Sequence, residues 1–320
     1  MANGALREMA EREAQALRAS APRPAFGVGL LSVVTTGLAA AGIAGFAVVA
    51  TFMGDDGADI QRVSVASSDT SSPTPVDDID REAAADLVEA NPLYGSGQME
   101  PGDCDRPDLD TDDPESMAAF LHGLTDCMDE TWEDQFEDGD SSFHPPVRHF
   151  WTVNGQSPCG RFPSADRAAF YCEMNQGLYL GVEDIVQSSH DSEDWESYAM
   201  LLSHEYAHHV QSEAGIISGY RALRAREGDS ARGESWTRRN ELQANCFGGA
   251  FLGTLEDSLP IDDESREELI SDARARGDSD AADRRTHGTP DNGELWANHG
   301  FDRMDPAACN TWDARDELVE

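Results

Sequence analysis

Residues 201–211 read LLSHEYAHHVQ and contain the pattern His-Glu-x-x-His. On a helix, His204 and His208 lie one turn apart on the same face, so both imidazoles can reach one metal ion. Glu205 then lies beside them, next to the coordination position that is left open for water. The opposite stripe is apolar and consists of Ala199, Leu202, Tyr206 and Val210. This pattern predicts a buried metal-binding helix over residues 194–214.

A catalytic zinc ion takes three protein ligands and a water molecule, so the pattern requires a third ligand. We expect it to be Glu241, in the sequence ELQANC, on a second predicted helix over residues 235–255. Asn245 follows one turn later and can accept a hydrogen bond from the outer N–H of a ligand imidazole. The predicted ligands of one zinc ion per chain are therefore His204, His208 and Glu241.

Two other classes of zinc enzyme fit the sequence less well. A metzincin has Gly and His after the second histidine, at the positions that Gln211 and Ala214 occupy here. An aspzincin takes its third ligand from a GTxD segment, and a GTPD segment of this chain ends at Asp291. That class has Tyr three residues later, where this chain has Glu294. Metzincins are therefore excluded, and the aspzincin ligand is the weaker alternative.

A long uncharged segment, residues 25–53, predicts a single transmembrane helix. Its 29 residues are enough to cross the ~30 Å hydrocarbon core of a bilayer. Four arginines precede it and two aspartates follow closely, so the positive-inside rule places residues 1–24 in the cytoplasm as a tail. Small residues at Gly37, Ala41 and Gly45 could pair two anchors into a weak homodimer. We therefore expect a single-pass protein of the cell membrane whose remaining chain is extracytoplasmic.

The composition separates a linker from a folded domain and excludes one class of partner. Residues 54–85 are polar and rich in Ser, Pro and Asp, which predicts a flexible stalk, and residues 86–320 are expected to fold. The chain has 62 acidic and 23 basic residues, which give a formal net charge of −39. This charge repels phosphate backbones, so nucleic-acid binding is excluded.

Cysteine usage agrees with an extracytoplasmic domain. All six cysteines follow the predicted anchor, on the side where thiols oxidise, and they are Cys104, Cys127, Cys159, Cys172, Cys246 and Cys309. Three disulfides are expected, and the sequence alone allows 15 pairings.

The remaining elements predict an α+β fold class. A helix is expected from Asp113-Pro114 onward, because apolar residues follow at three- and four-residue steps, at Met117, Phe120, Leu121, Leu124, Met128 and Trp132. Short strands are predicted over residues 147–153 and 177–180. The two motif helices follow, separated by an Arg-rich polar stretch. The whole chain is thus expected to contain a transmembrane helix, a flexible stalk, and a domain with a small sheet and two zinc-binding helices.

Several motifs together resemble those of the bacterial neutral zinc metallopeptidases. HEYAHHVQ, ELQANCFGG and HGTP occur here in the order of that family's usual HEYGHHVQ, ELQADCFAG and HGTS. The segments NPLY, SPCG and FYC also fit the family pattern, particularly that of its membrane-anchored actinobacterial members. The resemblance covers roughly Asn91 to Cys309. Two departures are Asn245, where the family has Asp, and Pro290, where it has Ser.

The resemblance implies a gluzincin-like domain with His204, His208 and Glu241 as zinc ligands and Glu205 as general base. His287, in the HGTP segment, is the candidate donor to the oxyanion, with Tyr220 as a second candidate. The family order also implies the disulfides Cys104–Cys127, Cys159–Cys172 and Cys246–Cys309. The departure at Asn245 removes a negative charge behind a zinc ligand, which is expected to affect metal affinity or activity.

The sequence therefore predicts a membrane-anchored, extracytoplasmic zinc metallopeptidase that hydrolyses peptide bonds in a peptide or protein substrate. An alternative is a membrane-tethered binding or scaffold protein whose zinc site is structural or degenerate, and Asn245 is the feature that favours it. Glu205 favours catalysis, because a general base does nothing for metal geometry and is expected to be lost in a pseudoenzyme.

Overall fold

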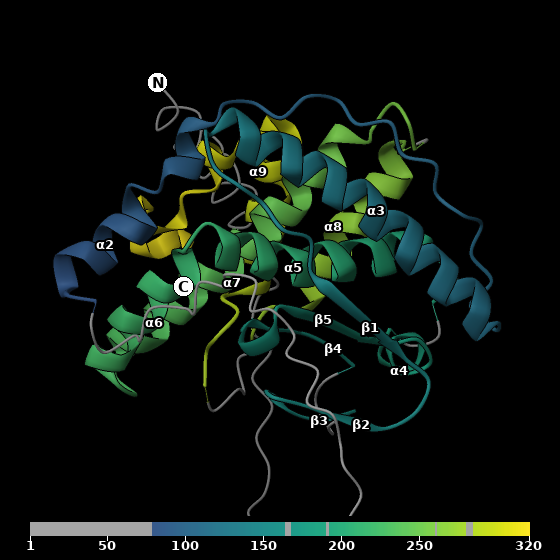
Figure 1. Ribbon diagram of the computed structural model, residues 1–320, viewed down its shortest axis with the longest axis horizontal. Coiled ribbons are helices and arrows are strands. Elements are labelled where there is room, and N and C mark those ends of the chain that lie inside the picture. The colour runs from purple at the N-terminus through teal and green to yellow at the C-terminus, as the bar shows by residue number, and fades with distance from the viewer. Residues whose placement is uncertain (1–78, 164–167, 190–191, 260, 280–283) are drawn as a thin grey trace, which may run out of the picture. The chain divides into compact units, whose positions relative to one another are not determined.

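The predicted motif helix is helix α5, Trp195–Glu213, of the computed structural model. The structure describes residues 79–163, 168–189, 192–259, 261–279 and 284–320 (Figure 1). The stripe opposite the histidines is completely buried, at Ala199, Leu202, Tyr206 and Val210. The prediction of a buried helix is confirmed.

Helix α3, Pro114–Asp138, packs against α5 and begins where the sequence predicts. The Asp113 side chain accepts a hydrogen bond from the Glu115 amide, and Pro114 occupies the first turn, where a missing N–H costs nothing. The predicted apolar face is almost completely buried, at Met117, Phe120, Leu121, Leu124, Met128 and Trp132. In Figure 1, α3 lies above α5 and the strands lie below it.

The strands form two small sheets, and the first of them covers the other side of α5. The first contains strands β1 (Val147–Trp151), β5 (Gly177–Gly181) and β4 (Ala169–Cys172), in the order β1-β5-β4. Strand β5 runs parallel to β1, with Val147 opposite Gly177, and antiparallel to β4, with Cys172 opposite Gly177. The second sheet is the antiparallel pair β2 (Gly155–Ser157) and β3 (Gly160–Phe162). Strand β4 is thus an edge strand, and it packs against α5.

The second motif helix is α7, Ala231–Thr254, which begins four residues earlier than predicted. It starts there because the Ser230 side chain accepts a hydrogen bond from the Gly233 amide and so caps the helix. Helix α7 packs against α5 on one side and α9, Pro290–Arg303, on the other. The remaining elements are α2 (Arg81–Glu89), α4 (Asp184–Ser188), α6 (Ile216–Glu227), α8 (Asp263–Ala275) and the short 3-10 helices at 92–95, 173–175, 306–309, 311–313 and 316–318.

The predicted α+β class is wrong, because the described part of the chain is mostly helical and its sheets are small. The Arg-rich stretch after α5 is helix α6, which buries Ile216, Ile217, Ala222 and Leu223 while its arginines remain on the surface or half-buried. Helices α6, α8 and α9 were not predicted, because they are short and contain few apolar residues, so their sequences do not stand out as core helices.

The structure does not test the predicted transmembrane helix. Among the residues described, no helix combines the length and the apolar character needed to cross a membrane. The predicted anchor, residues 25–53, and the cytoplasmic tail before it lie outside the described residues. Helix α2 begins at Arg81, inside the segment 54–85 that was expected to be a stalk.

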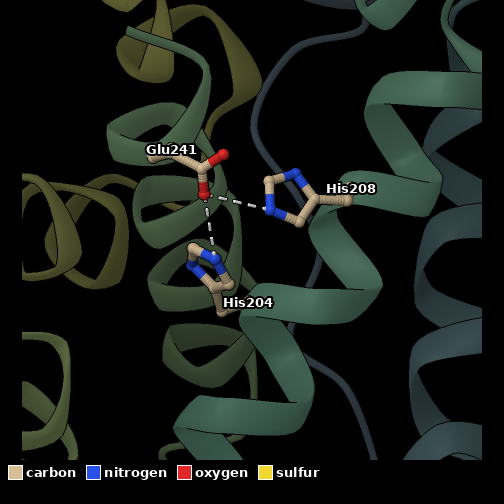
Figure 2. A group of neighbouring side chains, drawn as sticks. All are labelled: His204, His208 and Glu241. Atoms are coloured by element: carbon tan, nitrogen blue, oxygen red, sulfur yellow. Dashed lines mark ion pairs between the residues drawn. The ribbon is translucent and has the colours of Figure 1, made fainter. Parts of the chain in front are cut away.

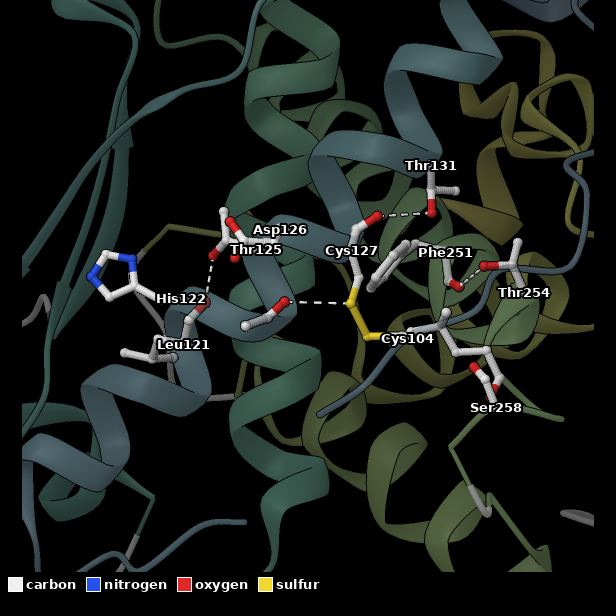
Figure 3. The surroundings of a disulfide bond; sticks show 12 residues. Cys104, Leu121, His122, Thr125, Asp126, Cys127, Thr131, Phe251, Thr254 and Ser258 are labelled. Carbon is white, nitrogen blue, oxygen red and sulfur yellow. Dashed lines mark hydrogen bonds between the residues drawn. A yellow bond between two sulfur atoms is a disulfide. The ribbon is translucent and has the colours of Figure 1, made fainter. Parts of the chain in front are cut away.

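All six cysteines form disulfides, joined as Cys104–Cys127, Cys159–Cys172 and Cys246–Cys309. This is the pairing that the family resemblance implies. Figure 3 shows the first of these bonds, which holds the segment before α3 to that helix near Phe251 and Thr254 of α7. The Gly102 amide donates to the carbonyl of Thr254 at 2.9 Å, so the same segment is also fixed to the end of α7.

Helices α7 and α9 approach so closely that glycines are required between them. A Cβ at Gly300 would lie 1.9 Å from the carbonyl oxygen of Cys246, and one at Gly249 would lie 2.2 Å from that of Ala297. Real Cβ contacts are longer, and a helix backbone cannot yield as a flexible side chain can. The α7–α9 contact is therefore built on direct backbone packing.

We expect Gly300→Ala to destabilise the domain by about 3 kcal/mol, because the added methyl group forces the two helices apart. Urea unfolding of the purified protein measures this change. The matched control is Gly95→Ala, since an added Cβ at Gly95 meets no atom within 4 Å. The control should change stability by less than about 0.5 kcal/mol. Equal stability of the two variants would contradict the backbone-packing interpretation.

Candidate active site

Helices α5 and α7 bring three candidate metal ligands together (Figure 2). One carboxylate oxygen of Glu241 lies 3.4 Å from Nε2 of His204 and 3.2 Å from Nε2 of His208. The ligand atoms of the three residues all lie within 4.8 Å of one another. Two imidazole nitrogens and a carboxylate form the donor set of a catalytic zinc site that keeps one position open. These residues could therefore hold one zinc ion.

The geometry follows from local structure and from one close helix contact. His204 and His208 lie one turn apart on α5, as the motif predicts. Helix α7 can approach α5 closely because Gly248 of α7 faces Ser203 of α5. A Cβ at position 248 would lie only 3.2 Å from the backbone carbonyl carbon of Ser203. This approach allows Glu241, two turns earlier on α7, to reach between the two imidazoles.

The outer nitrogens of both histidines also have partners. Nδ1 of His204 lies 2.8 Å from Oδ1 of Asn245, which is the contact that the sequence predicts for position 245. Nδ1 of His208 lies 2.9 Å from Oε1 of Gln211. An acceptor on Nδ1 keeps the proton there and turns Nε2 toward the metal. Both imidazoles are therefore oriented for ligation.

Gln211 is a site residue that the sequence did not assign. Its amide nitrogen donates to the carbonyl of Asn240 at 2.9 Å and to Oε1 of Gln243 at 3.0 Å, so its oxygen is held toward His208. Gln243 in turn donates to the hydroxyl of Tyr94 and accepts from Nε1 of Trp312. The spacing between the two residues could have predicted this role, because Gln211 lies three positions after His208 on the same face of the helix.

Charge also favours cation binding at this centre. Burial lowers the pKa of His208, but the adjacent carboxylate of Glu241 outweighs this and raises the pKa to about 9. Burial raises the pKa of Glu241, but His208 and His204 hold it well below its usual value. A proton therefore neutralises the centre near neutral pH, and a metal ion would take its place.

A cleft of 830 Å³ opens over the three candidate ligands. Glu205 lines this cleft, and its carboxylate accepts a hydrogen bond from the Tyr171 amide of strand β4 at 3.0 Å. His287 lines it from another side, with Nε2 3.8 Å from the Glu241 carboxylate. The backbone amides of His287 and Gly288 both donate to the Asp278 carboxylate, at 2.8 and 2.9 Å, which fixes this turn.

Other sequence candidates lie elsewhere. Asp291, the rival ligand, lies in the first turn of α9 and pairs with Arg274 at 2.6 Å, apart from the ligand cluster. The hydroxyl of Tyr220 lies 3.1 Å from that of Thr237, and Tyr220 is not among the described residues that line the cleft. The geometry thus favours Glu241 over Asp291 and His287 over Tyr220.

Two residues inside the motif support the helix from behind. The hydroxyl of Tyr206 donates to the Asp129 carboxylate at 2.7 Å. His209 is fully buried, with Nε2 2.7 Å from the carbonyl oxygen of His144 and Nδ1 3.1 Å from the hydroxyl of Tyr171. These three contacts join α5 to its neighbours, away from the candidate ligands.

A family model described as "Putative neutral zinc metallopeptidase" matches residues 85–312. The chain belongs to this family. The match contains every candidate ligand and lining residue discussed above. Membership supports a zinc-dependent peptidase at the level of the family, and it agrees with the three-residue site between α5 and α7.

Two relatives show how much of this chain is similar in sequence to other proteins. "Uncharacterized protein YpfJ" of Escherichia coli (strain K12) is 27% identical over 209 residues, which are 62% of this chain and 72% of the relative. "Uncharacterized protein Mb2605" of Mycobacterium bovis is 26% identical over 191 residues, which are 52% of this chain and 63% of the relative. The chain thus spans less than two thirds of the mycobacterial relative. No solved structure matches the chain.

We expect Asn245→Asp to raise zinc affinity roughly tenfold, since a carboxylate accepts the His204 N–H more strongly than an amide oxygen does. Competition with a chelator measures the affinity. Asn298→Asp is the matched control, because it adds the same charge on α9, where Asn298 contacts Arg266. An equal gain in both variants would assign the effect to net charge and contradict a direct contact with His204.

The buried His209 predicts a loss of stability in acid. Burial lowers the pKa of His209 to about 4 from the usual histidine value of 6.5, so the unfolded chain takes up the proton first as pH falls. The stabilisation is complete above pH 6.5 and disappears as pH falls toward 4. Between pH 7 and pH 5 we expect His209 to contribute a loss of about 2 kcal/mol.

Urea unfolding of metal-free protein at several pH values tests this expectation, with His209→Gln as the comparison. The variant should be less stable at pH 7 but should lose about 2 kcal/mol less than the parent between pH 7 and pH 5. Parallel pH profiles would show that another group carries the effect.

Proposed function

We propose that this protein is a zinc-dependent peptidase that hydrolyses peptide bonds in the cleft between α5, α7 and strand β4. One observation carries the proposal: Glu205, which is not one of the three candidate ligands, lies in the same cleft as His204, His208 and Glu241. A structural zinc site has no use for such a carboxylate.

When bound, zinc would supply Lewis acidity, which lowers the pKa of a water molecule to ~7 and polarises the substrate carbonyl. Glu205 accepts the proton of that water and later transfers it to the leaving amine. The Tyr171 amide holds the Glu205 carboxylate at 3.0 Å, which orients it for this role. His287 donates to the oxyanion that develops on the substrate, and Asp278 fixes the turn that carries it.

The cleft suits an extended peptide. Strand β4 is an edge strand, and Ala169, Phe170 and Tyr171 line the cleft next to Glu205. The outer edge of such a strand presents backbone groups that can pair with a peptide backbone. A peptide or protein substrate is therefore the expected partner.

The alternative of a degenerate zinc site rests on Asn245. Its side-chain oxygen still lies 2.8 Å from Nδ1 of His204, so the substitution keeps the hydrogen bond and removes only the charge. The presence of Glu205 and of a cleft above the ligands favours catalysis.

We propose an extracytoplasmic location for the domain. Its three disulfides and the absence of free cysteines among the described residues are typical of proteins from oxidising compartments. Attachment to a membrane through residues 25–53 stays a prediction from the sequence.

We expect Glu205→Gln to lower kcat at least about a hundredfold on an unstructured protein such as casein, because the variant cannot accept a proton. Its zinc content should equal that of the parent, since Glu205 is not a ligand. Glu133→Gln, on the exposed side of α3, is the matched control and should retain activity. Zinc-dependent hydrolysis by Glu205→Gln at the parent's rate would contradict the mechanism.

A further inference from the structure

Three charged side chains line the cleft without being candidate ligands: Glu205, Asp184 and Arg276. The proposed reaction uses Glu205. The other two are left to interact with the substrate, and their charges are opposite. The ion pairs and hydrogen bonds that Asp184 and Arg276 already form determine which of the two charges stays available to a substrate.

Arg276 is already neutralised. Its Nε and Nη2 atoms both donate to one carboxylate oxygen of Asp272, at 2.8 and 2.6 Å. The two side chains form a compact ion pair that is mostly buried, with 22% of Arg276 and 13% of Asp272 exposed. The pair adds little net charge to the cleft.

Asp184 differs, because no cation among the described residues pairs with it. Oδ2 accepts a hydrogen bond from the indole N–H of Trp151 at 2.9 Å, which is a neutral donor. The carboxylate lies against Gly181, where a Cβ would approach Oδ2 to 2.3 Å, so the position depends on that glycine. Asp184 is thus a half-buried carboxylate, fixed in place and without a counter-charge from the part of the chain that the structure describes.

The surroundings of Asp184 suit a cationic side chain. Gln187 and Ser188, one turn later on α4, line the same wall of the cleft and offer neutral oxygen acceptors. The chain's net charge of −39 also attracts cationic peptides and repels acidic ones before contact. A guanidinium or ammonium group of a substrate would pair with the Asp184 carboxylate on this wall.

We propose that Asp184 selects peptides that carry an Arg or Lys side chain within the segment bound in the cleft. This inference rests on the proposed function, because it assumes that a peptide occupies the cleft. It assigns the substrate class, basic peptides, and names Asp184 as the residue that determines it.

The test measures binding separately from cleavage. The probe is a fluorescein-labelled peptide of alanine and glycine with one central Arg, and its twin has citrulline, which has the same shape without the charge. Both are titrated against zinc-loaded Glu205→Gln protein by fluorescence anisotropy. We expect the Arg peptide to bind roughly tenfold to a hundredfold more tightly than its twin.

Asp184→Asn in the same background should bring the two affinities within about twofold, because an amide can still accept the Trp151 bond but carries no charge. Asp112→Asn is the control, since it removes the same charge from an exposed residue outside the cleft and should keep the preference. Thermal unfolding of each variant verifies that it is folded.

Equal binding of the two peptides, no binding of the Arg peptide at millimolar concentration, or an unchanged preference in Asp184→Asn would overturn the inference. Cleavage of both peptides by the parent protein is measured in parallel, with and without chelator. Binding that shows the preference without zinc-dependent cleavage would contradict the proposed function alone. Zinc-dependent cleavage without the preference would contradict the role of Asp184 alone.

Discussion

The crossing of α5 and α7 is the constraint on which the rest of the structure depends. It brings one carboxylate oxygen of Glu241 within 3.4 Å of two imidazole nitrogens in a buried place. Burying a carboxylate is costly unless a positive charge accompanies it, and here His208 supplies that charge as long as no metal is bound. The contact of Gly248 with Ser203 sets how closely the two helices can lie. Helices α3 and α9 and the sheet then hold this crossing from three sides.

Polar residues in the core hold both histidine ligands from behind. Asn245 supports His204, and Gln211, which is itself held by Gln243, supports His208. Buried amides are tolerated when their hydrogen bonds are satisfied, and such networks restrict side chains to one arrangement. The imidazoles thus have few alternative orientations before a metal ion arrives.

The parts of this molecule that the sequence predicts are those encoded by local periodicity. Helices α3 and α5 have long apolar stripes, and the two histidines of the motif face one side for the same reason. The role of Asn245 follows from its spacing to Glu241 on one helix. The contact between Glu205 and the Tyr171 amide joins segments 34 residues apart, and no local pattern encodes it. Helices α6, α8 and α9 gain their stability from tertiary packing, which their mixed sequences conceal.

The network around Gln243 has a consequence for the time at which the site can form. Gln243 contacts Tyr94 near the start of the described domain, and Cys309 and Trp312 near its end. A ribosome makes the amino end first, so the histidines of α5 emerge about a hundred residues before Cys309 and Trp312 do. Until those last residues have followed, Gln243 lacks part of its support, and with it the residue that orients His208. A nascent chain would therefore carry the metal-binding motif without its finished scaffold, which delays formation of the site until Trp312 has been made.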